Sequence, residues 1–89
     1  MLESSAELRR FPRARRLRQA LCIFNNGSSS LDVTVRDISA SGARVIGDGL
    51  LFLPKTFELR IHESDDFYSV RSARLIWTDG RNAGLEFID

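Results

Sequence analysis

The chain has 89 residues, of which 43% are hydrophobic and 28% are charged, and its formal net charge at pH 7 is +1. This length and composition are typical of one small globular domain with little room for a deep cleft. The longest apolar run, residues 49–54, is far too short to span a bilayer. One cysteine and one histidine exclude an internal disulfide and a zinc site built from these two residue types.

The first residues, 1–8, show no periodicity, and we expect them to be a disordered lead-in to a domain over residues 9–89. Residues 1–5 have neither the basic nor the apolar region of a signal peptide. We therefore expect a cytoplasmic protein.

An arginine-rich segment comes next. Residues 7–18 hold six arginines and one acid, a charge of +5 that leaves −4 on the rest of the chain. Twelve of the 13 basic residues are arginine, which suits forked recognition of phosphate or of a guanine edge, although a genome of high GC content would also enrich arginine. Pro12 disfavours a helical conformation at Phe11, so we interpret residues 9–15 as an extended or turned arm. Repulsion between the arginines predicts that this arm is flexible without a ligand.

Six short runs of alternating apolar and polar residues follow, separated by turn signals, and they predict six strands. The runs cover residues 17–24, 31–36, 43–46, 57–62, 67–77 and 83–87. In the first run, we expect Leu21 and Ile23 on the buried face and Cys22 on the other. The regular spacing and the lack of a convincing helix favour an antiparallel barrel, because closure removes exposed strand edges.

The apolar pattern changes parity at two places; the first change predicts a β-bulge or a corner, and the second predicts a β-bulge. The first follows Asp37, where the next apolar residue is Ile38. The second lies near residues 71–72, where the apolar positions change from even to odd numbers. The apolar residues 50–54 form a separate run that ends in proline, and we expect a loop that covers one mouth of the barrel.

Two motifs carry a family resemblance. An R-x-x-x-R element, from Arg9 to Arg13 with Arg10 between them, precedes a D-x-S-x-x-G element over residues 37–42. Each motif alone is weak, but the pair in this order resembles the PilZ domain, the bacterial receptor module for cyclic di-GMP. The resemblance extends from about residue 7 to residue 87 and includes the closing Gly-Leu-Glu-Phe.

The family resemblance implies a six-stranded antiparallel β-barrel of the PilZ, split-barrel-like type. Many members add a C-terminal helix, but this chain stops at Asp89, directly after the last predicted strand. We therefore expect no C-terminal helix and a stand-alone, single-domain member of the family.

The resemblance also implies which residues bind the ligand. Arg9 and Arg13 would contact guanine and phosphate, with Arg10 beside them, and a forked arginine–guanine contact gives about 1–3 kcal/mol of discrimination. Asp37 would accept hydrogen bonds from a guanine edge, although an aspartate at this place also caps its own turn. Ser39 would bond phosphate or the guanine amine, or else bond locally.

Two further residues, at the end of the second motif and just after it, have a less specific expected role in ligand binding. Gly42 would supply either a backbone with positive φ or close approach of the ligand, which a Cβ would block. Arg44, just past the turn, could project near the ligand.

These observations lead to a hypothesis of a cyclic di-GMP receptor and adaptor. The dianionic ligand would neutralise and order the arm over the barrel, and an unidentified protein partner would read the new surface. One alternative is a PilZ-like interaction domain without ligand. Another is a nucleic-acid-binding barrel, which the apolar-face positions of the aromatic residues and the acidic remainder disfavour. No pattern indicates an enzyme, a metal or a cofactor.

Overall fold

The computed structural model describes residues 17–89. The expectations for the lead-in, residues 1–8, and for the arm that carries Arg9, Arg10 and Arg13 lie outside the described residues. The domain boundary at residue 9 therefore stays a prediction.

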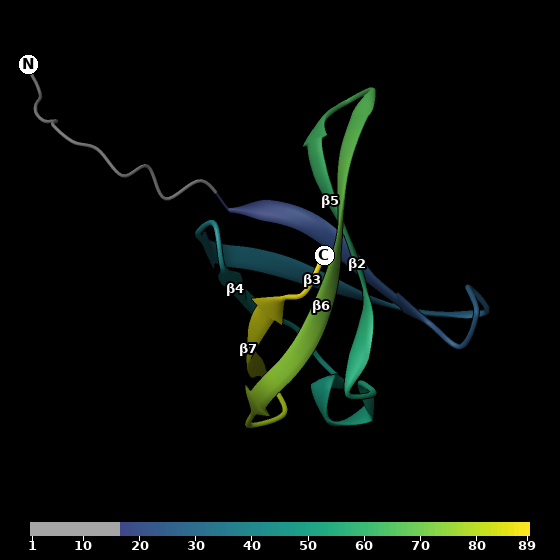
Figure 1. Cartoon of the computed structure of the whole chain (residues 1–89), viewed down its shortest axis with the longest axis vertical. Helices are drawn as coiled ribbons and strands as arrows, with labels where there is room; N and C mark the ends of the chain where they lie inside the picture. The colour runs from purple at the N-terminus through teal and green to yellow at the C-terminus, as the bar shows by residue number, and fades with distance from the viewer. Residues whose placement is uncertain (1–16) are drawn as a thin grey trace, which may run out of the picture.

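Six antiparallel strands form a closed barrel in the order β2-β3-β4-β7-β6-β5 (Figure 1). The strands are β2 (Arg18–Phe24), β3 (Ser29–Ile38), β4 (Gly42–Ile46), β5 (Thr56–Ser64), β6 (Phe67–Thr78) and β7 (Asn82–Phe87). The 3-10 turn η2 (Leu50–Phe52) precedes β5, and residues 88–89 after β7 are not helical. Over residues 17–89, the prediction of an all-β, six-stranded barrel without a C-terminal helix is confirmed.

Alternating apolar residues from all six strands fill the interior. The core consists of Ala20, Cys22, Val33, Val35, Val45, Leu50, Leu53, Phe57, Leu59, Ile61, Ala73, Ala83 and Leu85. Leu50 and Leu53 come from η2 and its flank, so the predicted loop does fill one end of the barrel. Burial raises the pKa of the Cys22 thiol to about 12, so this side chain is a neutral core residue at pH 7.

The predicted inward face of β2 is wrong. Ala20 and Cys22 are buried, whereas Leu21 and Ile23 lie on the half-buried outer face. Small side chains suit a narrow barrel interior that is already filled by larger residues from the facing strands. The size of the side chains therefore determines which face of β2 points inward, and the number of apolar residues on each face does not.

One predicted bulge is confirmed and the other is misplaced. Val35 pairs with Val45 and Asp37 pairs with Arg44, so Arg36 is the extra residue of a bulge in β3. The pairing of β6 with β5 is regular through residues 71–72, and the irregularity lies instead opposite β7, between Leu75 and Trp77.

The parity change near residues 71–72 does not mark a bulge, because the β5–β6 hairpin extends beyond the barrel there (Figure 1). β6 pairs with β5 from Phe67 to Arg74, but with β7 only from Ala73 to Thr78. Tyr68 and Val70 lie on the outer, exposed face of the extended part. Their apolar side chains therefore do not mark a buried face.

The turn between β6 and β7 depends on one carboxylate. Oδ1 of Asp79 accepts hydrogen bonds from the backbone N–H groups of Arg81 (2.9 Å) and Asn82 (2.7 Å). These bonds hold the pKa of the Asp79 carboxyl below its usual value. Such a group stabilises the fold only where it is ionised, above its unfolded pKa of about 4.

We expect Asp79→Ala to lower the free energy of unfolding at pH 7, because the turn loses both hydrogen bonds. The difference from the wild type should shrink as the pH falls below about 4, because the carboxyl is protonated first in the unfolded chain and then, at lower pH, in the folded protein. Urea unfolding of both proteins between pH 3 and pH 7 measures this, with Asp65→Ala at another turn as the control. A difference that stays constant over that range would contradict the assignment.

Candidate functional site

The β3–β4 hairpin turns through a tight polar corner, residues 39–41. The backbone N–H of Ser39 donates to the carbonyl oxygen of Gly42 (2.8 Å), and the N–H of Ser41 donates to the Ser39 hydroxyl (3.3 Å). The N–H of Phe87 donates to the carbonyl oxygen of Ser41 (2.8 Å), which ties the corner to β7. Ser39 thus has a local bonding role, and its exposed hydroxyl keeps the capacity to bond a ligand.

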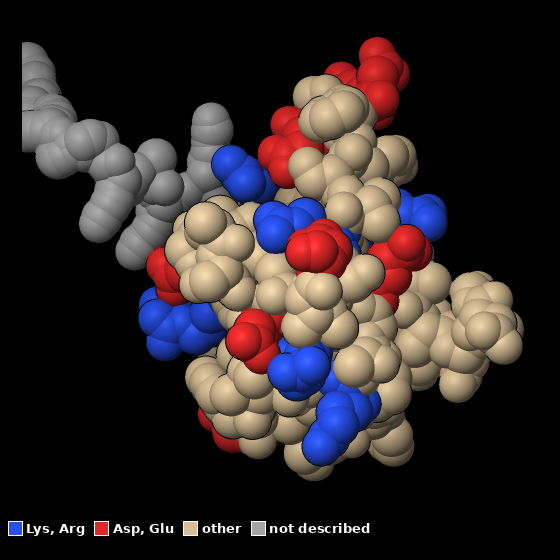
Figure 2. All heavy atoms as spheres, viewed as in Figure 1, with Lys and Arg blue, Asp and Glu red and all other residues tan. Residues whose placement is uncertain are grey.

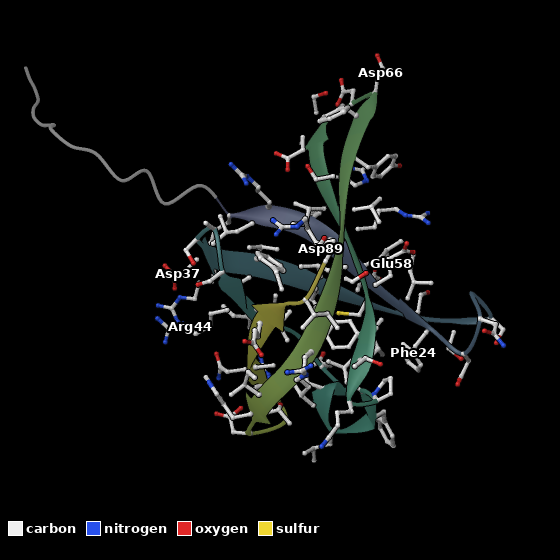
Figure 3. The ribbon with its side chains drawn as sticks, viewed as in Figure 1. Phe24, Asp37, Arg44, Glu58, Asp66 and Asp89 are labelled. Carbon is white, nitrogen blue, oxygen red and sulfur yellow. The ribbon has the colours of Figure 1, made fainter. Side chains whose placement is uncertain are left out.

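The bulge at Arg36 determines where Asp37 points. In a regular strand, side chains alternate between the two faces, so Asp37 would share the inward face of Val33 and Val35. The extra residue instead leaves Asp37 exposed on the outside of the barrel. There its Oδ2 accepts hydrogen bonds from Nε (3.2 Å) and Nη2 (3.0 Å) of Arg44 on β4 (Figure 3).

The Asp37–Arg44 ion pair orients its two side chains but contributes little to the stability of the fold. Each side chain is 49% exposed, and exposed pairs contribute no more than about 1 kcal/mol. Both bonds end on Oδ2, so Oδ1 has no hydrogen-bond partner among residues 17–89. The corner therefore presents a fixed carboxylate acceptor beside a guanidinium donor.

An open groove of about 510 Å³ begins at this corner. It is lined by Asp37, Ile38, Ser39, Ser41, Gly42, Ala43, Arg44, Ile76, Leu85 and Glu86. Glu86 is itself paired with Arg74 of β6 at 3.2 Å. The groove combines cationic, carboxylate, hydroxyl and apolar groups, which suits a ligand with both charged and flat apolar parts.

Gly42 is required by the approach of a neighbouring strand. Its φ is not among the positive values, which glycine takes at Gly27, Gly49 and Gly80, so the expectation of a positive φ is wrong. A Cβ at residue 42 would collide with the backbone carbonyl oxygen of Leu85 in β7. The glycine therefore allows β4 and β7 to pack closely at the base of the groove.

The structure brings together three of the six predicted site residues: Asp37, Ser39 and Gly42 all line the groove. The other three, Arg9, Arg10 and Arg13, lie outside the described residues. The strand register nevertheless places the start of β2 at this end of the barrel, because Arg18 pairs with Val35. Two residues of an extended strand, about 7 Å, separate Val35 from Asp37.

Some groove residues were not predicted as site residues. Arg44 was expected only as a residue that could project near the ligand. The available signal was its position two residues after Gly42, which puts both residues on the same face of β4. Ile76 and Glu86 come from β6 and β7, and their place follows from the strand order β4-β7-β6, which local patterns do not encode.

Two features are absent from the part of the chain that the structure describes. No helix within residues 17–89 is long and apolar enough to cross a membrane. The same residues contain no group of three or more His, Cys, Asp or Glu side chains placed to hold a metal ion.

A comparison with protein families gives a match over most of the chain. The family model of the PilZ domain matches residues 7–89, nearly the whole chain, including both the arginine motif and the corner motif. No curated protein matches the sequence.

The collision at Gly42 gives a stability prediction. We expect Gly42→Ala to lower the free energy of unfolding by about 1–3 kcal/mol, because backbone must move to admit the Cβ. Ser41→Ala is the matched control, and an exposed substitution of this kind changes stability by no more than about 0.5 kcal/mol. Urea unfolding compares them, and equal stability of the two variants would contradict the close-packing role.

Proposed function

This chain belongs to the PilZ domain family, and on that premise we propose that it is a receptor for cyclic di-GMP, bound in the groove at the β3–β4 corner. The observation that carries the proposal is the bulge-directed Asp37, held by Arg44 beside the start of β2. The polar motif residues face solvent together in this groove, and the barrel interior uses none of them.

The ligand chemistry fits the groups of the groove. Cyclic di-GMP carries two phosphodiester charges and two guanines. The unbonded Oδ1 of Asp37 suits the N1–H and N2–H donors of a guanine, and the Ser39 hydroxyl suits a phosphate oxygen or the guanine amine. Arg44 supplies a donor at the same corner, and the ligand would compete with Asp37 for it.

The arm supplies the remaining cations in this proposal. Arg13 is four residues and Arg9 eight residues before Leu17, so an extended chain allows reaches of about 14 Å and 29 Å. Both reaches exceed the offset of about 7 Å between Val35 and Asp37 along β3. Arg9, Arg13 and the adjacent Arg10 can therefore meet phosphate and guanine at the corner while the barrel stays intact.

The binding step would also act as a switch. Residues 7–18 carry a charge of +5, and a dianionic ligand relieves the repulsion among their arginines. A ligand that binds only the ordered arm shifts the population toward that state. We propose that the arm then covers the groove and that a protein partner reads the surface so formed, which makes the chain an adaptor.

Calorimetric titration with cyclic di-GMP tests the site directly. We expect binding by the wild type and affinities lower by about 5- to 150-fold for Asp37→Ala and Arg13→Ala, because each variant loses a contact worth about 1–3 kcal/mol. Arg60→Ala is the matched control, because Arg60 lies on β5 outside the groove and is paired with Glu58. Failure of the wild type to bind would favour an interaction domain without ligand.

The salt dependence separates a dinucleotide from a nucleic acid. We expect the logarithm of the binding constant to fall with the logarithm of salt concentration with a slope of about −1 to −2, since the ligand has two phosphates. Titrations with cyclic di-GMP and with single-stranded RNA at several salt concentrations measure it. Tighter binding of the RNA, with a slope that reports many phosphates, would instead support a nucleic-acid-binding module.

A further inference from the structure

Among the residues that the structure describes, the extended part of β6 has a strand neighbour on only one side. Between Phe67 and Ser72 it pairs with β5, whereas its pairing with β7 begins at Ala73. Within residues 17–89, no strand lies along the other edge of this part. In Figure 1 the hairpin rises beyond the barrel, at the same barrel end as the β3–β4 corner.

Hydrogen bonds near Ser72 show which backbone groups face this edge. The carbonyl oxygen of Ser72 accepts from the N–H of Ile88 (2.9 Å), and its N–H donates to the Asp89 carboxylate (3.1 Å). The N–H of Leu75 points the other way, to the carbonyl oxygen of Lys55 just before β5 (2.8 Å). Even-numbered residues of β6 therefore direct their backbone groups away from β5.

The same alternation applies to the extended part of the strand, whose register with β5 is regular from Tyr68 to Arg74. In an antiparallel strand, alternate residues direct both N–H and C=O to the same edge. Tyr68 and Val70 therefore present four backbone hydrogen-bonding groups to an edge that no described strand covers. An edge of this kind is a template for the addition of another strand.

The side chains at this edge are apolar. Tyr68 is 46% exposed, Val70 49% and Phe67 59%. The Tyr68 ring also contacts the His62 ring edge-on, with 4.5 Å between centroids, which holds it on the outer face. Natural edge strands usually carry charged side chains that prevent pairing, and these two edge positions carry none.

Acidic residues surround the tip of the hairpin (Figure 2). Oε1 of Glu63 lies 3.7 Å from the Arg18 guanidinium, and Oε2 accepts a hydrogen bond from the Ser69 hydroxyl. Asp65 and Asp66 have no ion-pair partner within residues 17–89. The edge thus ends in a negative tip that would attract a basic chain and repel an acidic one.

We propose that the outer edge of β6 at Tyr68 and Val70 is a docking surface for an extended segment of a partner protein. The segment adds to the sheet as a strand, places apolar side chains against Tyr68 and Val70, and carries lysine or arginine at the end that meets Asp65 and Asp66. This surface is separate from the groove at the β3–β4 corner, so docking does not require cyclic di-GMP.

Amide hydrogen exchange of the whole chain alone tests whether the edge is free. We expect the amides of Tyr68 and Val70 to exchange rapidly, while the amides of Ser69 and Arg71, which face β5, are protected. Protection of Tyr68 and Val70 in the monomer would show that residues 1–16 of the same chain cover the edge. Protection that appears with dimerisation would assign it to a second copy, and either result overturns the proposal.

Synthetic peptides then test the kind of partner. The probe is an acetylated peptide of about eight residues that alternates valine and threonine and ends in two lysines, and its counterpart ends in two glutamates. We expect the lysine peptide to protect the Tyr68 and Val70 amides and to bind at least about tenfold more tightly than the glutamate peptide. Binding of neither peptide, or equal binding of both, would overturn the proposal.

Variants locate the binding on the edge. Val70→Pro removes an N–H that faces away from β5 and should abolish peptide binding without breaking the β5–β6 ladder. Val70→Lys provides a second test if the proline variant does not fold. Leu51→Lys, at an equally apolar, exposed position in η2, is the control and should bind the peptide like the wild type. Undiminished binding by either folded Val70 variant would contradict the assignment.

Discussion

The extra residue Arg36 in β3 is the constraint on which the candidate site depends. It changes which face of β3 the following side chains point to. Asp37 therefore does not point inward with Val33 and Val35, and it bonds Arg44 on the outside of the barrel. A carboxylate in the interior of so small a barrel would need a partner that the all-apolar core does not offer. The bulge thus keeps the Asp37 carboxylate out of the apolar core and places it beside Arg44 at the corner.

Unequal strand lengths give the barrel two distinct regions. At the β3–β4 corner, the short strand β4 packs against β7 so closely that only glycine fits at residue 42, and the groove is formed over this contact. At the same end of the barrel, β5 and β6 continue past their neighbours, and Arg71, bonded to Asp89 and lying 3.9 Å over the Phe87 ring, marks where the pairing with β7 ends. The site and the open edge both follow from where the strand ladders stop.

Local sequence patterns predicted the parts of the fold that local physics determines. Alternation gave the six strands, and the parity change after Asp37 gave the bulge that directs it. The inward face of β2 was wrong because Ala20 and Cys22 are chosen by the space inside the barrel, which depends on the facing strands. Ile76 and Glu86 join the groove only through the order of β4, β7 and β6, which no short motif contains.

The central claim is that the arm and the β3–β4 corner close on one ligand. A nitroxide attached at Ala6→Cys tests it, because the native Cys22 is buried and its raised pKa makes it unreactive. On addition of cyclic di-GMP, the account predicts stronger paramagnetic broadening of the amide signals of residues 39–43 than of those at the hairpin tip, residues 64–67. Saturation with ligand and no change at residues 39–43 would contradict it.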